Sequence, residues 1–345
     1  MADVVWRPDE EILEHANVVR FMRKHGFSTY RELVARSIDD REWFWPAAVE
    51  DMGLDLEEPW SQVVDLARGP EWATWFRGAK LNIASNCVHR WRSDRIAAIF
   101  RGEDGARREL TFAELSDAVT RLAERLVQLG VEPGDRVAIY LPMSPEVAIA
   151  SHACAHIGAV QVPVFSGFAA PAVAQRLVDS SAKVAITART SLRRGREVPM
   201  LAILEEARRE APALEHVIVA PWDDEVARCP GALEPLPVES EHPYLLTYTS
   251  GTTGKPKGVL HVQGGFLISV AREACYQADA HRNDVVHFST DMGWIMGPWT
   301  VVGCGATGFT GSVMQVERKQ APTSVPPEMF MIGARPPPTR SNSQR

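Results

Sequence analysis

The sequence is poor in cysteine, has no excess of basic residues and contains no long apolar run. Its five cysteines are scattered and no Cys-x-x-Cys pair occurs, which argues against a disulfide framework and against a zinc site. Its formal net charge is −7 and its pI is near 5.8, which disfavours a nucleic-acid binder because such proteins present a basic face. We therefore predict no protein-bound metal site and no nucleic-acid partner.

Membrane segments are also missing from the pattern. The most apolar stretch, residues 147–164, is interrupted by polar residues and Pro163, so it is a poor match to a bilayer-spanning helix. The first fifteen residues are acidic and lack the apolar core of a signal peptide. The scattered cysteines are expected to be reduced thiols. Together with this expectation, these features predict no membrane span and a cytoplasmic location.

Three segments of different character follow one another along the chain. Residues 1–92 are rich in tryptophan and carry a helical period up to about residue 52, which predicts a helical N-terminal extension. Residues 93–308 alternate between strand-like and helix-like segments, which predicts an α/β fold with mainly parallel sheets flanked by helices. Residues 309–345 accumulate prolines without periodicity, and we expect an irregular or disordered tail.

The alternation in the middle segment is clear enough to place individual elements. Thr111 is expected to cap an amphipathic helix over residues 112–129, which Gly130 ends. Further helices are expected at Pro145–Ile157, Pro171–Asp179, Pro199–Arg209 and Gly264–Gln277. Strands are expected at Ile96–Phe100, Arg136–Leu141, Ala159–Val164, Lys183–Thr187, His216–Ala220 and Asp284–Ser289.

The most informative stretch is residues 245–265, which read LLTYTSGTTGKPKGVLHVQGG. Two β-prone pieces flank a loop rich in glycine, hydroxyl residues and lysine. Backbone N–H groups of such a loop can approach phosphate oxygens because glycine has no Cβ, and the hydroxyls and lysines add donors and positive charge. The spacing differs from a Walker A loop, since Gly251 and Gly254 are only three positions apart and Pro256 follows Lys255. A flexible solvent loop is the alternative.

This string resembles the phosphate-binding signature of the adenylate-forming superfamily, which includes acyl-CoA synthetases, the adenylation domains of peptide synthetases, and luciferases. The resemblance implies formation of an acyl-AMP from a carboxylate and ATP with Mg²⁺, followed in many members by transfer of the acyl group to coenzyme A. It implies catalytic roles for Thr249 and Lys257. It implies that the phosphates of ATP are bound by Thr249, Ser250, Gly251, Thr252, Thr253, Gly254, Lys255, Lys257 and Gly258. For Lys255, an exposed surface lysine without a binding role is the alternative.

Three other segments resemble the acetyl-CoA-synthetase-like branch. Residues 71–84 are similar to its N-terminal extension. Residues 291–299, DMGWIMGPW, resemble its acyl-pocket segment, which implies substrate contacts by Trp294, Met296, Gly297 and Trp299, although a buried aromatic segment is the alternative. Met296 replaces the threonine of the acetate-type pattern, which favours a different short acyl chain. Arg193 and Arg194 lie where such enzymes contact the CoA phosphates, with an exposed basic loop as the alternative.

Other parts of the superfamily pattern do not occur in the sequence. We find no Tyr-Gly-x-Thr-Glu segment for adenine and magnesium, no later aspartate for the ribose, and no C-terminal domain with its adenylation lysine. The expected function is therefore ATP-dependent activation of a short or medium carboxylic acid by the N-terminal fragment of an AMP-forming acyl-CoA synthetase, inactive alone. A non-catalytic nucleotide-binding or interaction remnant and a non-CoA adenylating enzyme are the alternatives.

Overall fold

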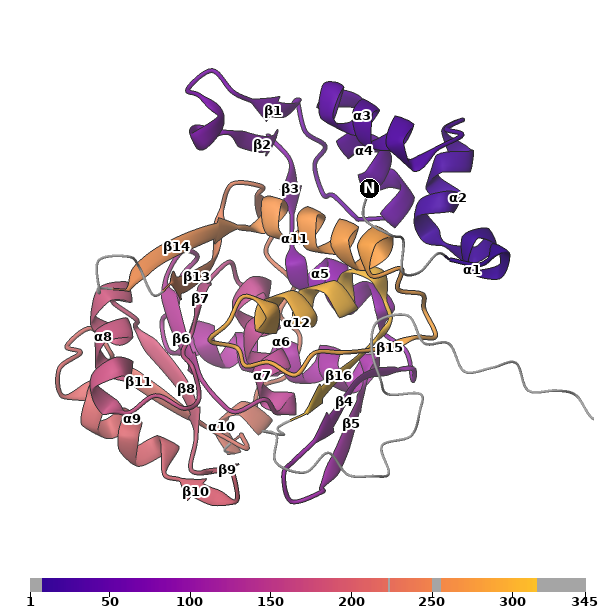
Figure 1. Cartoon of the computed structure of the whole chain (residues 1–345). Coiled ribbons are helices and arrows are strands. Elements are labelled where there is room, and N and C mark those ends of the chain that lie inside the picture. Colours follow the sequence, from indigo (N-terminus) through magenta and orange to yellow (C-terminus); the bar gives the residue numbers. More distant parts are fainter. Residues whose placement is uncertain (1–7, 223, 250–255, 315–345) are drawn as a thin grey trace, which may run out of the picture.

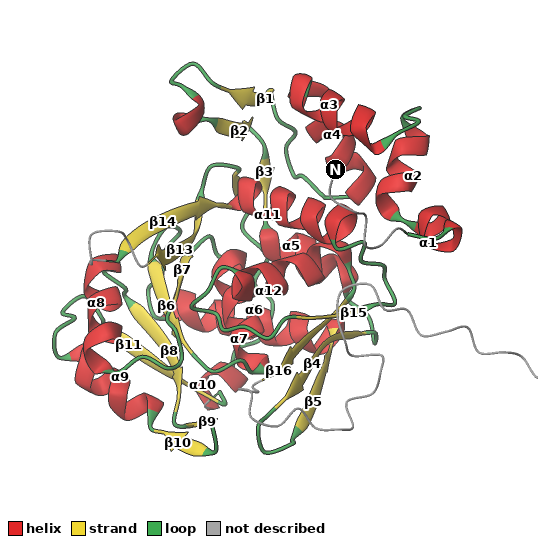
Figure 2. Ribbon diagram, viewed as in Figure 1, coloured by secondary structure: helices red, strands yellow, loops and turns green. Residues whose placement is uncertain are grey.

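A computed structural model describes residues 8–222, 224–249 and 256–314 of the chain. Its centre is a six-stranded sheet and a smaller four-stranded sheet with helices around and between them (Figures 1 and 2). The predicted α/β class is therefore confirmed. In spatial order the large sheet contains β11 (His216–Ala220), β8 (Val184–Ala188), β6 (Arg136–Tyr140), β7 (Val160–Pro163), β13 (Pro243–Thr249) and β14 (Lys257–Val262).

The large sheet is parallel except at one edge. The first five strands run in the same direction, and β14 pairs antiparallel with β13. All five residues of β8 are buried, as expected for a central strand covered on both faces. The sheet is accompanied by α6 (Phe112–Gln128), α7 (Pro145–His156), α8 (Ala170–Ser180) and α9 (Met200–Arg208). Every residue of α7 is buried, because this helix contacts strands of both sheets.

The smaller sheet corrects one expectation about the end of the chain. Its order is β15 (Val285–His287), β16 (Thr310–Met314), β4 (Ile96–Arg101) and β5 (Arg107–Thr111). Thr310–Met314 falls within the segment that we expected to be irregular, yet it lies between two strands that supply its backbone hydrogen bonds in parallel. Those partners are remote in sequence, so a local pattern could not reveal them. Residues 315–345 of the expected tail lie outside the described residues.

The N-terminal extension is helical, as predicted, and packs on the α/β part. It contains α1 (Glu10–His15), α2 (Asn17–Lys24), α3 (Tyr30–Asp39) and α4 (Arg41–Met52), followed by the hairpin of β1 (Gln62–Asp65) and β2 (Thr74–Arg77). The first two helices are separated at Ala16, where the backbone is extended. Asn17 holds this break, since its amide donates to the carbonyls of Cys275 and Ala280 at 3.1 Å each.

Short elements complete the connections. They are β3 (Lys80–Leu81), which pairs with β12 (Val238–Glu239), α5 (Ile83–Cys87), the hairpin of β9 (Ser191–Arg193) and β10 (Arg196–Val198), α10 (Asp224–Ala227), α11 (Gln263–Arg272), a π-helical turn at Glu273–Gln277, and α12 (Met296–Thr307). Helices α11 and α12 pack against each other, and α12 also contacts α5. Among the described residues, no helix is both long and apolar enough to cross a bilayer.

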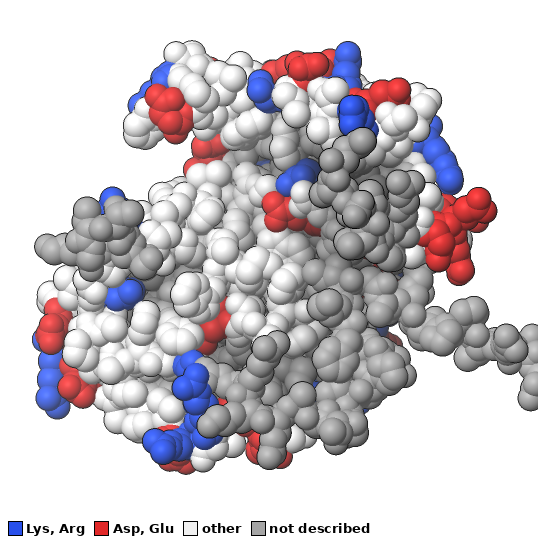
Figure 3. Space-filling view, viewed as in Figure 1, with Lys and Arg blue, Asp and Glu red and all other residues white. Residues whose placement is uncertain are grey.

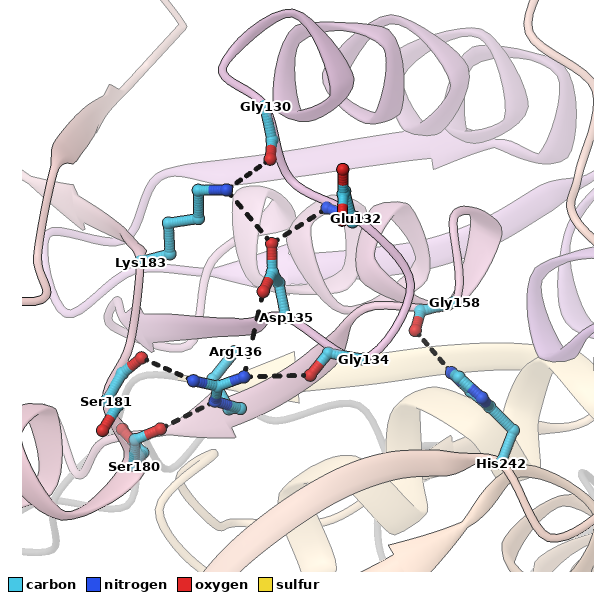
Figure 4. A network of polar contacts seen from close by, with 10 residues as sticks. All are labelled: Gly130, Glu132, Gly134, Asp135, Arg136, Gly158, Ser180, Ser181, Lys183 and His242. Atoms are coloured by element: carbon cyan, nitrogen blue, oxygen red, sulfur yellow. Dashed lines mark hydrogen bonds and ion pairs between the residues drawn. The ribbon is translucent and has the colours of Figure 1, made fainter.

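A polar network ties the amino ends of β6 and β8 to the helices before them (Figure 4). Arg136 donates from Nε to the carbonyl of Ser180 at 2.8 Å and from Nη2 to that of Ser181 at 3.1 Å, at the end of α8. Lys183 donates to the carbonyl of Gly130, just after α6. Cations at helix C-termini satisfy carbonyls that lack an intrahelical partner and favour the helix dipole. The polar residues at the amino ends of β6 and β8 therefore stabilise the fold.

Two hydrogen-bonded histidines, the buried His156 and the partly buried His89, lie between α6, α7 and the connector before β12. His89 Nδ1 is 2.8 Å from Ser116 Oγ, His89 Nε2 is 3.0 Å from His156 Nδ1, and His156 Nε2 is 3.0 Å from the carbonyl of Leu233. A carbonyl only accepts, so His156 donates from Nε2, His89 donates to His156, and Ser116 donates to His89. Burial lowers the pKa of both His89 and His156 to about 4, so both rings are neutral in the folded protein.

We expect the free energy of unfolding to fall as the pH drops from about 6.5 towards 4. The unfolded chain binds protons on these histidines near pH 6.5 and the folded chain only near pH 4, so lowering the pH favours the unfolded state by about 1.4 kcal/mol per pH unit per histidine. Urea unfolding at several pH values measures this slope. His89→Gln should reduce it, whereas His15→Gln, at an exposed position, should leave it unchanged. Equal slopes in the two variants would contradict the assignment.

Candidate functional site at the carboxyl edge of the large sheet

The carboxyl ends of β6, β7, β8 and β13 meet at one edge of the large sheet, because these strands are parallel. Ligands of open α/β sheets bind at this edge, where the loops that follow the strands converge. The segments that leave it begin after Tyr140, Pro163, Ala188 and Thr249. They include the hairpin that carries Arg193 and Arg194, and the predicted phosphate loop begins at Thr249, at the same edge.

The phosphate loop joins two paired strands. Thr249 ends β13 and Lys257 begins β14, and the two residues are partners across the ladder, both exposed. Gly258 pairs with Tyr248, and a Cβ on this glycine would lie 3.0 Å from Cδ1 of Leu246. The two flanking strands expected from the sequence are therefore present. The predicted residues between the two ends, Ser250, Gly251, Thr252, Thr253, Gly254 and Lys255, lie outside the described residues.

Two residues of helix α8 contact Tyr248, near the end of β13. The hydroxyl of Tyr248 donates to Oδ2 of Asp179 at 2.7 Å, and the guanidinium carbon of Arg176 lies 5.6 Å from the centre of the Tyr248 ring. Burial raises the pKa of Tyr248, which keeps the phenol protonated and able to donate. Arg176 also lies 4.6 Å from the ring centre of Phe168, so a single arginine contacts both the β13 end and the loop after β7.

Phe165, in the loop after β7, connects two of the predicted contacts. The guanidinium carbon of Arg193 lies 4.6 Å from the centre of the Phe165 ring, and the ring of Trp294 lies edge-on at 6.4 Å. Phe168 contacts the same ring at 5.2 Å, and its carbonyl accepts a hydrogen bond of 2.9 Å from the hydroxyl of Tyr140. The structure thus brings together a predicted CoA-contacting arginine and a predicted acyl-pocket tryptophan, which are a hundred residues apart in the sequence.

A buried aspartate fixes the turn that carries Trp294 to the loop that carries Phe165. Asp291 accepts a hydrogen bond of 2.5 Å from the hydroxyl of Ser166 and one of 2.9 Å from the backbone N–H of Gly293. Burial raises the pKa of Asp291, and these hydrogen bonds oppose that change by favouring the carboxylate. A Cβ on Gly293 would lie 2.6 Å from Cα of Phe165, so the two segments touch through their backbones.

The four predicted acyl-pocket residues occupy different environments. Trp294 is 64% exposed, and Met296, which begins α12, is partly buried. Trp299 is buried; its ring stacks edge-on against Phe288 at 5.1 Å and its Nε1 donates to Oε2 of Glu273 at 2.7 Å. These contacts give Trp299 a packing role on the side of α12 that meets the π-helical turn.

Gly297 and Arg194 hold special backbone positions. A Cβ on Gly297 would lie 2.6 Å from the carbonyl oxygen of Asp291, so the start of α12 requires glycine there. Arg194 forms the turn between β9 and β10 with a φ of 53°, and its backbone N–H donates to Oε1 of Glu103 at 2.9 Å. The adjacent N–H of Gly195 donates to Oε2 of the same carboxylate at 3.0 Å. Glu103 therefore fixes the hairpin that presents the two arginines.

Four residues of this edge were not predicted from the sequence: Tyr140, Phe165, Ser166 and Arg176. The sequence did contain a signal for this loop, since Phe165-Ser166-Gly167-Phe168 follows a buried strand, where parallel sheets place their ligand-binding loops.

In the described part of the chain, no group of three or more histidine, cysteine, aspartate and glutamate side chains is arranged to hold a metal ion. The face shown in Figure 3 carries acidic and basic residues interspersed around its periphery, with mostly uncharged residues at its centre.

The chain belongs to the AMP-binding enzyme family, whose model matches residues 85–329. Within that class, residues 30–87 match the model of the acetyl-coenzyme A synthetase N-terminus, so the acetyl-CoA-synthetase-like resemblance is also confirmed.

Individual relatives show how much of the family architecture the chain spans. It is 36% identical to acetyl-coenzyme A synthetase of Methanothrix thermoacetophila over 86% of this chain and 48% of the relative. It is 40% identical to that of Streptomyces coelicolor over 79% of this chain and 44% of the relative. The solved acetoacetyl-CoA synthetase from Streptomyces lividans superposes with a TM-score of 0.84 at 29% identity, over 91% of this chain and 51% of that one. The chain thus spans about half the length of the relatives it matches.

Proposed function

We propose that this chain supplies the N-terminal half of an enzyme that activates a short or medium carboxylic acid with ATP and Mg²⁺ and passes the acyl group to coenzyme A. The carboxylate attacks the α-phosphate, pyrophosphate leaves, and the CoA thiol then displaces AMP. The observation that carries the proposal is the convergence of Arg193 and Trp294 on Phe165, at the sheet edge from which the phosphate loop also leaves.

Each part of this edge has a role in the proposal. Thr249 and Lys257, with residues 250–255, hold the β- and γ-phosphates, where the charge on the leaving pyrophosphate develops. Arg193 and Arg194 contact the CoA phosphates. Trp294, Met296 and Gly297, with the buried Trp299 behind them, shape the acyl pocket. The cytoplasm is the proposed compartment, and five free cysteines, all buried, support it.

The test compares the chain with a completed enzyme, in which it is continued by the second half of an acetyl-CoA synthetase relative. With ATP, Mg²⁺, CoA and a panel of carboxylates, we expect the completed enzyme to form acyl-CoA and residues 1–345 alone to form little or none, because positioning of the reacting groups needs both halves. Adenylate formation without CoA-dependent product release would indicate a non-CoA adenylating enzyme. Failure of the completed enzyme to catalyse carboxylate-dependent pyrophosphate exchange would support a non-catalytic role.

Met296 is expected to select the acyl chain. In the completed enzyme, Met296→Thr should lower kcat/KM for butyrate by about 10-fold and change that for acetate less, because an apolar contact with the longer chain is lost. Met52→Thr makes the same chemical change at a partly buried position in α4, remote in sequence from the site, and should alter both substrates equally. An equal effect of Met296→Thr on acetate and butyrate would remove Met296 from the proposed pocket.

A further inference from the structure

A second pocket lies where the N-terminal helices meet the end of α11. Its volume is about 440 Å³, which is in the range of small-molecule sites. Phe44 and Trp45 of α4, Trp75 of β2 and Tyr276 of the π-helical turn line it, and Ile38 of α3, which is 59% exposed, stands among its lining residues. The walls are largely aromatic and apolar, and the lining residues come from six different elements.

The charged residues that line this pocket are basic. Arg272 and Arg41 are among its lining residues, and in the described part of the chain no acidic residue lines it. Arg272 stands over the Trp45 ring, with its guanidinium carbon 5.9 Å from the ring centre. Its Nη2 donates to Oε1 of Glu273 at 3.2 Å, whereas its Nε is buried and has no hydrogen-bond partner among the described residues. The guanidinium is charged, and an anion in the pocket would compete with Glu273 for its Nη2 donor.

The backbone beside the pocket is irregular. Glu273–Gln277 forms a π-helical turn directly after α11, and such turns occur frequently at functional sites. This turn places Tyr276 and Gln277 in the pocket wall, while the hydroxyl of Tyr276 donates to Oδ2 of Asp51 at 2.8 Å. The tyrosine is thereby fixed in place, so the pocket is preformed on this side.

The pocket is also joined to the helix that begins at the candidate active site. Glu273 accepts from Arg272 with one carboxylate oxygen and from Nε1 of Trp299 at 2.7 Å with the other. Trp299 belongs to α12, three residues after Met296. An anion that bonds to Arg272 would compete with Glu273 for the guanidinium, and Glu273 also orients Trp299.

We propose that this pocket binds a small apolar monocarboxylate, with its hydrocarbon or aromatic part against Trp45, Trp75 and Phe44 and its carboxylate on Arg272. This site is separate from the one at which a carboxylate would be activated. The aromatic wall supplies apolar burial and the guanidinium supplies two-donor recognition of a carboxylate. The carboxylate of the ligand would replace Glu273 as the partner of the Arg272 guanidinium.

Calorimetric titration of the purified chain tests this site without any need for catalysis, with phenylacetate as the probe. We expect saturable binding with a dissociation constant below about 1 mM. Phenylacetamide, which has the same shape and no charge, should bind at least about 10-fold more weakly, because hydrogen bonds to charged groups are the stronger ones. Absence of phenylacetate binding, or equal binding of the two probes, would overturn the proposal.

Variants locate the probe. Arg272→Gln should weaken phenylacetate binding about 10-fold or more, whereas Arg68→Gln removes an arginine that stacks on Trp72 at 5.4 Å outside the pocket and should leave binding unchanged. Because Arg272→Gln also removes a partner of Glu273, Ile38→Trp provides an independent variant that fills the pocket from an exposed position and should abolish binding. Binding that survives both changes but is lost in Trp294→Ala would place the probe at the carboxyl edge and overturn the proposal.

Discussion

Lys257→Ala in the completed enzyme is expected to slow carboxylate-dependent ATP–pyrophosphate exchange by about 10²–10³-fold, the usual cost of removing one group that stabilises developing charge. Lys257 is exposed at the first position of β14 and pairs with Thr249 across the mouth of the loop. In the proposed function, its ammonium group contacts the phosphates. The negative charge on pyrophosphate grows as the bond to the α-phosphate breaks, so the lysine stabilises the transition state more than the bound ATP.

Two further variants separate charge from structure. Lys257→Arg keeps the cation and should retain more exchange activity than Lys257→Ala. Lys24→Ala removes an exposed lysine of α2 that pairs with Glu50, and should leave exchange unchanged. Gly251→Val, in the part of the loop that the structure does not describe, should also slow exchange because a branched side chain would hinder the approach of the backbone to phosphate. Full exchange activity in both Lys257→Ala and Gly251→Val would show that this loop does not bind the phosphates.

The sequence was most informative where local chemistry determines local structure. Thr111 caps α6 as predicted, because Glu114 three residues later completes a capping box. In the N-terminal extension, α3 is capped by Thr29, whose box partner is Glu32, and not by the adjacent Ser28, and α4 is capped by Asp40, which accepts from the backbone N–H of Trp43. Thr29 has a glutamate at the third following position and Ser28 has an arginine, so the distinction was present in the sequence.

The contacts between the segments of the site could not be predicted from the sequence, because they depend on the tertiary structure. Arg193 and Phe165 follow parallel strands of the large sheet, whereas Trp294 lies between β15 of the smaller sheet and α12, so only the packing of the two sheets brings the three segments together. The hydrogen bond between Ser166 and Asp291 spans 125 positions and has no local signal. The family resemblance named Arg193 and Trp294 separately, whereas Phe165 as their shared contact follows only from the fold.

Gly297→Ala is expected to lower the free energy of unfolding of the chain by about 2–4 kcal/mol, although alanine is the better helix former by about 1 kcal/mol. The new Cβ would lie 2.6 Å from both the carbonyl oxygen of Asp291 and Cα of Met292. These are backbone atoms that cannot rotate away, so α12 or the preceding turn must move. Urea unfolding followed by circular dichroism measures the loss.

Gly303→Ala is the matched control, because it lies in the same buried helix and its Cβ would meet only side-chain atoms, the nearest being the Cγ1 methyl of Val270 at 3.2 Å. A side chain can adjust by a few tenths of an ångström, so this variant should remain within about 1 kcal/mol of the parent chain. Equal stability of the two variants would show that the turn tolerates a side chain. If Gly297→Ala alone is destabilising, the glycine that marks the family string serves first to let α12 start against Asp291, and thereby places Trp294 beside Phe165.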